Sequence, residues 1–395
     1  MKILLITPAC HFTNAGAAQR DIYAAITTLQ KLNFEVAVYS IDSAAQDRAT
    51  LKSVADKYKI DLRTFLPPKN NWSRFKSVLT EFSLFDGAAY VFKQLCLDKK
   101  FLGFLRDFQP NRVFSFCSYS WPVLELAKTM GIHSVFRSHN FESDFFWESL
   151  NIGQKFNPLN WLRVGAKYLG EKKAVIYSSA VASLPFEQMK KYQAWKKENV
   201  QILTLFFLPE SLRAPAVHAG KQSLDLFFLG ASYNVIFHLR GAELLIEQIA
   251  PRVLALAAGK FRFHICGSKL PQRLVDKCKD GIIYEGYVEN LEEFLSSMDA
   301  GVFPVMTGKT MKGKVFESLA RALPIVMSSN CLGGYDLKDG QEMLLADSVQ
   351  EFVEKIIGLS DAGLRQRLSD GAAMLAAMEF SEAKIESVLK NLLKV

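Results

Sequence analysis

Two successive series of short apolar runs, separated by amphipathic stretches, extend along this chain of 395 residues. In the first series the apolar runs predict strands at 2–7, 35–40, 112–116, 134–138, 180–184 and 201–205, and an amphipathic stretch predicts a helix at 17–31. The second series predicts strands at 224–229, 261–266, 282–284, 300–304 and 325–328, with helices at 241–257, 270–277, 291–298, 315–321 and 349–359. This alternation indicates mostly parallel sheets covered by helices on both faces.

The segment 208–223 separates the two series and is typical of a linker, because it contains two prolines and few large apolar residues. A chain of this length, 49% hydrophobic, is too long for one ordinary core and sufficient for two. We therefore expect an α/β fold of two Rossmann-like domains, 1–207 and 224–379, facing across a cleft. A C-terminal helix at 380–395 is expected to pack back on the first domain. In such sheets ligands bind at the carboxyl ends of the strands.

Several classes of protein are excluded by composition. No stretch of eighteen uncharged apolar residues occurs, so we expect no transmembrane helix, and the apolar run at residues 3–6 is too short for a secretory signal. The six cysteines show no paired spacing. That favours free thiols in a reducing cytoplasm over disulfides or a structural zinc site.

The positive charge is concentrated in the first half of the chain. Residues 1–200 hold 27 Lys and Arg against 17 Asp and Glu, a net charge of +10, whereas the remainder has a net charge of −2. Two stretches there, 65–76 and 156–173, mix aromatic and basic residues. They could rest on an anionic membrane or hold a phosphorylated or lipid-linked glycan, and ordinary packing with solvated charge is the alternative. No nucleic-acid-binding module surrounds them, so we expect no nucleic acid partner.

Two loops that precede helices have the composition of anion sites. After the first predicted strand, residues 7–20 include the small residues Asn14-Ala-Gly16, and the single glycine argues against a dinucleotide fingerprint. A plain turn remains the alternative there. In the second half, residues 308–314 supply glycines and three lysines directly before a helix that carries one acid, Glu317. Backbone N–H groups and the helix N-terminus in such a loop suit a diphosphate.

Five segments are similar to elements of the retaining glycosyltransferases of family 4 (group 1), which have the GT-B architecture. These segments are 137–142 (Arg-Ser-His-Asn-Phe-Glu), 226–232, 263–268, 284–294 and 308–329. The resemblance covers nearly the whole chain. It implies transfer of a sugar from a nucleoside-diphosphate donor to an acceptor hydroxyl, with retention of the anomeric configuration.

The resemblance also implies site residues. It assigns His139 and Glu317 as catalytic, with Glu317 accepting the ribose hydroxyls. The donor-binding residues it implies are Gly230, Arg240, Gly267, Tyr287, Val288, Lys309, Met311, Lys312, Gly313, Lys314 and Glu317. The acceptor-binding residues it implies are His11, Gly16, Asn140 and Glu142, which assigns the acceptor to the first domain and the sugar nucleotide to the second.

Two positions depart from the family pattern. Many members carry a second Glu eight residues before the ribose Glu, and this chain has Lys309 there. The usual basic pair after Gly230 is replaced by Arg240 as the one strong base nearby. These departures favour one alternative, a non-catalytic scaffold of the same fold that binds nucleotide. A sugar-nucleotide epimerase is the other alternative, but it would need carboxylates facing the sugar, so Lys309 argues against it.

The sequence contains no Asp-x-Asp motif, which disfavours a metal-bound diphosphate, so we expect metal-independent transfer and no cofactor. The basic loop and helix end would instead stabilise the departing nucleoside diphosphate. Among family donors we favour uridine diphosphate sugars. The acceptor is expected to be a glycan or lipid-linked glycan in polysaccharide biosynthesis, and the enzyme to be cytoplasmic or peripheral on the inner face of the membrane.

Overall fold

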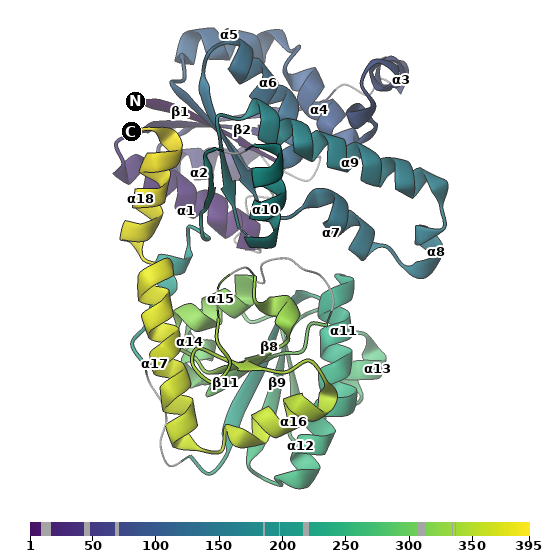
Figure 1. Ribbon diagram of the computed structural model, residues 1–395, viewed down its shortest axis with the longest axis vertical. Coiled ribbons are helices and arrows are strands. Elements are labelled where there is room, and N and C mark those ends of the chain that lie inside the picture. The colour runs from purple at the N-terminus through teal and green to yellow at the C-terminus, as the bar shows by residue number, and fades with distance from the viewer. Residues whose placement is uncertain are drawn as a thin grey trace. The chain divides into compact units, whose positions relative to one another are not determined.

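The computed structural model describes residues 1–8, 17–42, 48–67, 71–184, 186–196, 198–215, 221–306, 313–333, 335 and 337–395. The chain divides into two compact units: Met1–Phe207 with Ile385–Val395, and Leu208–Lys384. Each unit contains one sheet with helices packed against it (Figure 1). The fold class expected from the sequence, two parallel-sheet α/β domains, is confirmed.

The sheet of the first unit runs parallel throughout its described strand pairs. Its order is β3 (Asp61–Phe65), β2 (Glu35–Ile41), β1 (Lys2–Thr7), β4 (Arg112–Ser115), β5 (His133–Ser138), β6 (Ala180–Ser183) and β7 (Val200–Ile202). The central strands are buried on both faces, which is why they appear in the sequence as continuous apolar runs. The carboxyl ends of β1, β4 and β5 consequently lie side by side at one edge of the sheet.

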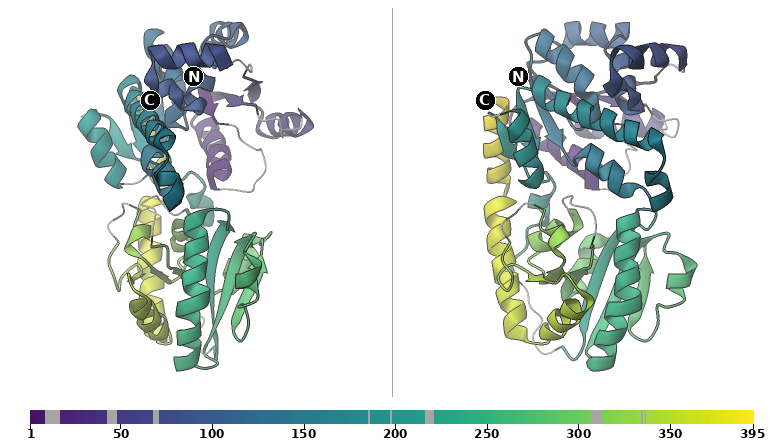
Figure 2. Two further views of the ribbon diagram at one scale, coloured as in Figure 1. Left: turned by 90° about the vertical axis from the view of Figure 1, so that its right-hand side faces the viewer. Right: turned by 45° about the vertical axis from the view of Figure 1, so that its right-hand side comes forward.

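The helices of the first unit flank this sheet and form a projecting group at one end (Figures 1 and 2). They are α1 (Ala17–Lys31), α2 (Arg48–Tyr58), α3 (Asn71–Thr80), η1 (Phe82–Phe85), α4 (Gly87–Leu95), α5 (Lys99–Phe108), η2 (Ser118–Ser120), α6 (Trp121–Thr129), α7 (Glu142–Ser149), α8 (Ile152–Lys155), α9 (Pro158–Tyr177) and α10 (Phe186–Trp195). Asn157 caps α9 by accepting from the backbone N–H of Leu159, and Pro158 stands at the first helical position, where no N–H is needed.

The last helix, α18 (Glu382–Leu393), brings the C-terminus to the first unit. His133 Nε2 lies 2.8 Å from the carbonyl oxygen of Leu392, and Arg112 Nε donates to the carbonyl oxygen of Leu393 at 2.7 Å. Carbonyls at the end of a helix have no partner within the helix, so these contacts from the first sheet satisfy them.

The second unit has a six-stranded sheet whose described pairs are again parallel. The order is β10 (Ile282–Gly286), β9 (Phe261–Ser268), β8 (Leu224–Ser232), β11 (Ala300–Phe303), β12 (Ile325–Met327) and β13 (Leu344–Leu345). Its helices are η3 (Leu208–Ser211), α11 (Ile236–Leu244), η4 (Leu245–Ile249), α12 (Ala250–Leu256), α13 (Gln272–Val275), α14 (Leu291–Ser297), α15 (Gly313–Ala320), η5 (Ser329–Cys331), α16 (Val349–Gly358) and α17 (Ala362–Glu379).

The helix predicted at 241–257 begins earlier and is irregular. It runs from Ile236 as α11, passes through a π-helical turn at Leu245–Ile249 and continues as α12. Pro251 explains the turn, because its ring clashes with the carbonyl one turn back and it has no N–H to donate.

Candidate functional site

His139 directly follows β5, at the carboxyl edge of the first sheet. Its Nε2 lies 2.9 Å from Oδ2 of Asp21, a residue of α1 that the sequence analysis missed. An ionised carboxylate only accepts hydrogen bonds, so Nε2 carries the hydrogen, and in the neutral form of the ring Nδ1 is the acceptor. The ring of Phe116 stacks on the imidazole, with centroids 5.9 Å apart. The orientation and the tautomer of His139 are therefore both set by neighbours.

Asp21 is fully buried and also neutralises a buried arginine. Its Oδ2 accepts from Arg137 Nε at 3.0 Å. The two other guanidinium nitrogens of Arg137 donate to the carbonyl oxygens of Leu203, at 3.1 Å, and Thr204, at 2.8 Å. Each of the three guanidinium nitrogens of Arg137 thus has a hydrogen-bond acceptor. These bonds connect β5 to α1 and to the segment after β7.

The carboxyl group of Asp21 stays ionised in spite of its burial. Burial alone would raise its pKa, but the Arg137 guanidinium, the contact with His139 and the backbone N–H of Phe206 together hold the pKa below its ordinary value. The N–H of Phe206 donates to Asp21 Oδ1 at 2.5 Å. The negative charge beside His139 is consequently present in the folded unit at neutral pH.

The remaining predicted residues of this region lie just beyond His139. Asn140 is partly buried, and Glu142 is the first residue of α7. Burial raises the pKa of Glu142 to about 7; the Lys167 ammonium opposes this rise and the Asp86 carboxylate adds to it. Asp144, in the first turn of this helix, pairs with Lys191 at 2.7 Å. The N-cap residue is Phe141, which has no side-chain acceptor.

In the second unit the predicted donor residues follow neighbouring strands. Gly230 lies near the end of β8, Gly267 near the end of β9, and Tyr287 and Val288 directly after β10. Helix α15, with Gly313, Lys314 and Glu317, follows β11. Because adjacent parallel strands end at the same edge, these residues line one edge of the second sheet. His11, Gly16, Lys309, Met311 and Lys312 lie outside the described residues.

At Gly230 and Gly267 a side chain would clash with neighbouring atoms. A Cβ on Gly267, whose φ is +137°, would meet the carbonyl oxygen of Gly230 at 2.5 Å, and a Cβ on Gly230 would meet the ring of Tyr233 at 2.8 Å. Tyr233 is buried and donates through its hydroxyl to the carbonyl oxygen of Cys266 at 2.8 Å. These glycines therefore allow β8 and β9 to approach each other under the tyrosine ring.

Glu317 is buried on the first turns of α15, with 1% of its side chain exposed. Oε1 lies 3.3 Å from Arg321 on the next turn, and Oε2 lies 3.6 Å from Lys314 on the preceding one. Arg321 is also paired at 2.9 Å with Glu292, which is half exposed. Glu317 is thus an ionic centre inside the unit, with a basic residue on the turn before it and another on the turn after it.

The other donor-site predictions lie at the surface. Arg240 is exposed on α11, and Tyr287 is 60% exposed.

Met306, the last described residue before α15 begins, is held by Asn330, whose side-chain amide donates to its carbonyl oxygen at 2.8 Å. The start of the loop between β11 and α15 is anchored to η5 in this way.

Comparison with known proteins gives one family for part of the chain. Residues 224–362, from β8 to the start of α17, match the family described as Glycosyl transferases group 1. This segment contains the predicted donor-binding residues. No curated protein matches the chain.

Solved structures share the fold over the full length. HepE of Anabaena in complex with UDP is 14% identical, with a TM-score of 0.66, and covers 100% of both chains. The lipopolysaccharide outer core galactosyltransferase WaaB in its apo form is 14% identical, with a TM-score of 0.60 and coverage of 100% of this chain and 99% of its own. WaaG, a glycosyltransferase involved in lipopolysaccharide biosynthesis, is 14% identical, with a TM-score of 0.62 and 99% coverage of both.

Proposed function

We propose that the chain is a retaining, metal-independent glycosyltransferase of family 4 that transfers a sugar from a uridine diphosphate donor to a glycan or lipid-linked acceptor. The observation that carries this proposal is the buried carboxylate of Glu317 on α15, which lies inside the segment that matches the group 1 family. HepE, whose fold the chain shares, has been solved with UDP-glucose. We assign the donor to the second unit and the acceptor to the first.

The chemistry assigned to the second unit is stabilisation of the leaving group. The N-terminus of α15 presents backbone N–H groups and the positive end of the helix dipole to the diphosphate, and Lys314 adds a full charge. Glu317 accepts from the ribose hydroxyls, and Tyr287 and Val288 lie by the base. Retention is proposed to follow from attack on the same face as departure, with the leaving phosphate assisting the acceptor hydroxyl.

The chemistry assigned to the first unit centres on the segment from His139 to Glu142. With its Nε2–H held by Asp21, His139 offers Nδ1 as an acceptor to a sugar hydroxyl. Glu142 has a pKa of about 7 and can exchange a proton near neutral pH. Asn140 supplies amide contacts to the acceptor.

A thermal-shift panel of uridine, guanosine and adenosine diphosphates and their sugars tests the donor class. We expect uridine diphosphate to stabilise the protein, by about 2.7 kcal/mol at a hundred times its dissociation constant. Stabilisation by a different base would correct the donor. If none of the nucleotides stabilised the chain, the donor site would be wrong and a scaffold role would be favoured. Conversion of the sugar in the absence of acceptor would mark an epimerase.

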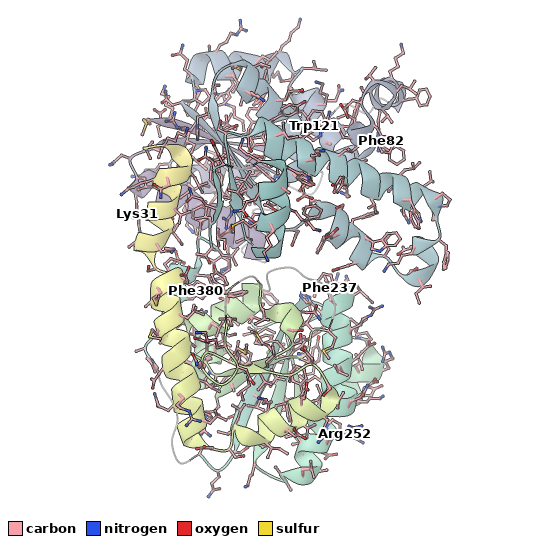
Figure 3. All side chains as sticks on the ribbon, viewed as in Figure 1. Lys31, Phe82, Trp121, Phe237, Arg252 and Phe380 are labelled. Carbon is pink, nitrogen blue, oxygen red and sulfur yellow. The ribbon has the colours of Figure 1, made fainter. Side chains whose placement is uncertain are left out.

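We further propose that the first unit rests on an anionic membrane surface through α8 and the start of α9, which lie at its outer end (Figure 2). Large apolar side chains are exposed there, with Phe156 79% and Trp161 61% exposed. Residues 151–165 contain two basic residues, Lys155 and Arg163, and no acid. Phe82, which is 37% exposed, lies next to Gly165 of α9 (Figure 3). Within the described ranges, no helix has the length and apolar content needed to cross a bilayer.

Flotation with vesicles tests this contact. We expect binding to phosphatidylglycerol vesicles, weaker binding at high salt, and little binding to phosphatidylcholine alone. The double variant Phe156→Ser, Trp161→Ser should bind about tenfold or more weakly, since each buried aromatic contributes roughly 1.5–3 kcal/mol. The control is Leu256→Ser, which removes an equally exposed apolar side chain, 70% exposed, from the second unit. Equal binding by all three proteins would contradict the membrane surface.

A further inference from the structure

A fully buried acid lies behind the segment from His139 to Glu142. Glu171, on α9, has none of its surface exposed. Its Oε1 lies 2.6 Å from the hydroxyl of Tyr192 on α10, and its Oε2 accepts from the backbone N–H of Glu142 at 2.9 Å. Lys167, one turn earlier on α9, is paired with Asp86 instead. Glu171 therefore contacts the first residue of α7 directly.

The same carboxyl group reaches the end of β5 through two hydroxyl groups. The oxygen of Tyr192 lies 2.6 Å from Oγ of Ser138, the residue before His139. Ser138 Oγ in turn lies 3.0 Å from the carbonyl oxygen of Asn140. A chain of three short contacts thus connects Glu171 to the backbone on the far side of His139. Tyr192 is fully buried and Ser138 nearly so.

Counting hydrogens gives the protonation state of Glu171. A hydrogen bond needs one hydrogen, and the carbonyl of Asn140 can only accept. Ser138 donates its single hydrogen to that carbonyl, so Tyr192 must donate to Ser138. The third contact, between Tyr192 and Glu171, then has no hydroxyl hydrogen left. All three contacts are hydrogen bonds only if the carboxyl group of Glu171 supplies the third hydrogen.

We propose that Glu171 is a neutral carboxylic acid and the positioning residue of the segment from His139 to Glu142. It holds this segment at both ends, through Tyr192 and Ser138 at Asn140 and directly at the N–H of Glu142. Phe141, between them, is buried with its ring stacked on Tyr192 at 5.9 Å. The catalytic part of this inference rests on the proposed function, whereas the protonation state does not.

The electrostatic surroundings agree with a neutral acid. Burial raises the pKa of Glu171 well above its ordinary value, and the carboxyl groups of Glu142 and Asp144 on α7 raise it further. The contact with Tyr192 and the N–H of Glu142 act in the opposite direction and lower the pKa. The facing ionisable groups that act on Glu171 are thus acids and a phenol, and none of them supplies a counter-charge.

Infrared difference spectroscopy tests the protonation state without any assay of transfer. At neutral pH we expect the wild type minus Glu171→Gln spectrum to contain the carbonyl band of a protonated carboxylic acid, shifted in heavy water. The matched control, Glu292→Gln, replaces a half-exposed acid and should show only carboxylate bands. A carboxylate band in place of the acid band in the Glu171→Gln difference would overturn the proposal.

Kinetics test the positioning role. In Glu171→Gln the amide N–H can donate to Tyr192 and the amide oxygen can accept from Glu142, so we expect kcat within about twofold of wild type. Glu171→Leu removes both contacts and should lower kcat about tenfold or more, with the donor KM nearly unchanged. Tyr192→Phe should lower kcat in the same way. A Gln variant as inactive as the Leu variant would overturn the positioning role. Absence of transfer in the wild type would instead refute the proposed function, and the infrared result would still stand.

Discussion

Replacing Asp21 by alanine is expected to destabilise the first unit by about 3–5 kcal/mol, because it leaves a buried guanidinium without its counter-ion. Arg137 is fully buried and lies 3.0 Å from the carboxylate that would be removed. The backbone N–H of Phe206 would also lose its acceptor. The measurement is urea unfolding followed by tryptophan fluorescence, in which the midpoint of the variant should fall to a clearly lower urea concentration.

The chain offers a matched control for this variant in the same unit. Asp61 and Arg63 on β3 also form an Asp–Arg pair, at 2.9 Å, but their side chains are 44% and 47% exposed. Exposed pairs contribute about 0–1 kcal/mol, so Asp61→Ala should barely move the midpoint. Similar losses in the two variants would mean that the buried pair contributes no more than a surface pair.

The sign of the acid dependence follows from the lowered pKa of Asp21. The folded state binds the proton of this group less readily than the unfolded state, whose Asp has its ordinary pKa of about 3.9. The contribution of Asp21 to stability is therefore complete at neutral pH and lost as the pH falls through the lowered folded value. Asp21→Asn should lack this part of the acid-induced loss, and parallel stability curves for the two proteins below pH 4 would contradict the assignment.

The central strands, which are buried on both faces, were all predicted from the sequence, and so were the more exposed edge strands β7 and β10. β1 and β4 are continuous apolar runs, and the structure places them at the centre of the first sheet. β3, with the sequence Asp-Leu-Arg-Thr-Phe, was missed because it forms the edge of that sheet. Its outer face is solvated, so it has no apolar run to reveal it. β13, with two residues, is too short for any periodicity.

The site was predicted only where local pattern or resemblance marked it. His139 follows a strand, whereas its partner Asp21 is 118 residues away in the sequence, and no local pattern connects the two. One signal was available: Arg137 stands inside an apolar strand, and a buried arginine requires a buried carboxylate.

For Gly230 and Gly267 the sequence could not distinguish between two reasons why a position must be glycine. Approach to a ligand and approach of another strand both exclude a side chain, and the structure supplies the second reason through Tyr233.

Replacing Glu317 by glutamine is expected to weaken uridine diphosphate binding about 100-fold. Two hydrogen bonds from ribose hydroxyls to a charged acceptor contribute roughly 3 kcal/mol or more together, and an amide offers one uncharged acceptor oxygen in place of two charged ones. Titration calorimetry with uridine diphosphate measures the change. The glutamine side chain keeps the volume of Glu317, so a folded variant is expected, although loss of the pairing with Arg321 at 3.3 Å should lower its melting temperature.

Glu292→Gln separates binding from packing in this experiment. Glu292 is paired with the same Arg321, at 2.9 Å, but its side chain is 49% exposed. The proposed donor site does not include Glu292. We expect this variant to bind uridine diphosphate as the wild type does. If Glu317→Gln also bound like the wild type while melting at a lower temperature, Glu317 would be the structural counter-ion of Arg321. A different residue at the carboxyl edge of the second sheet would then have to accept hydrogen bonds from the ribose hydroxyls.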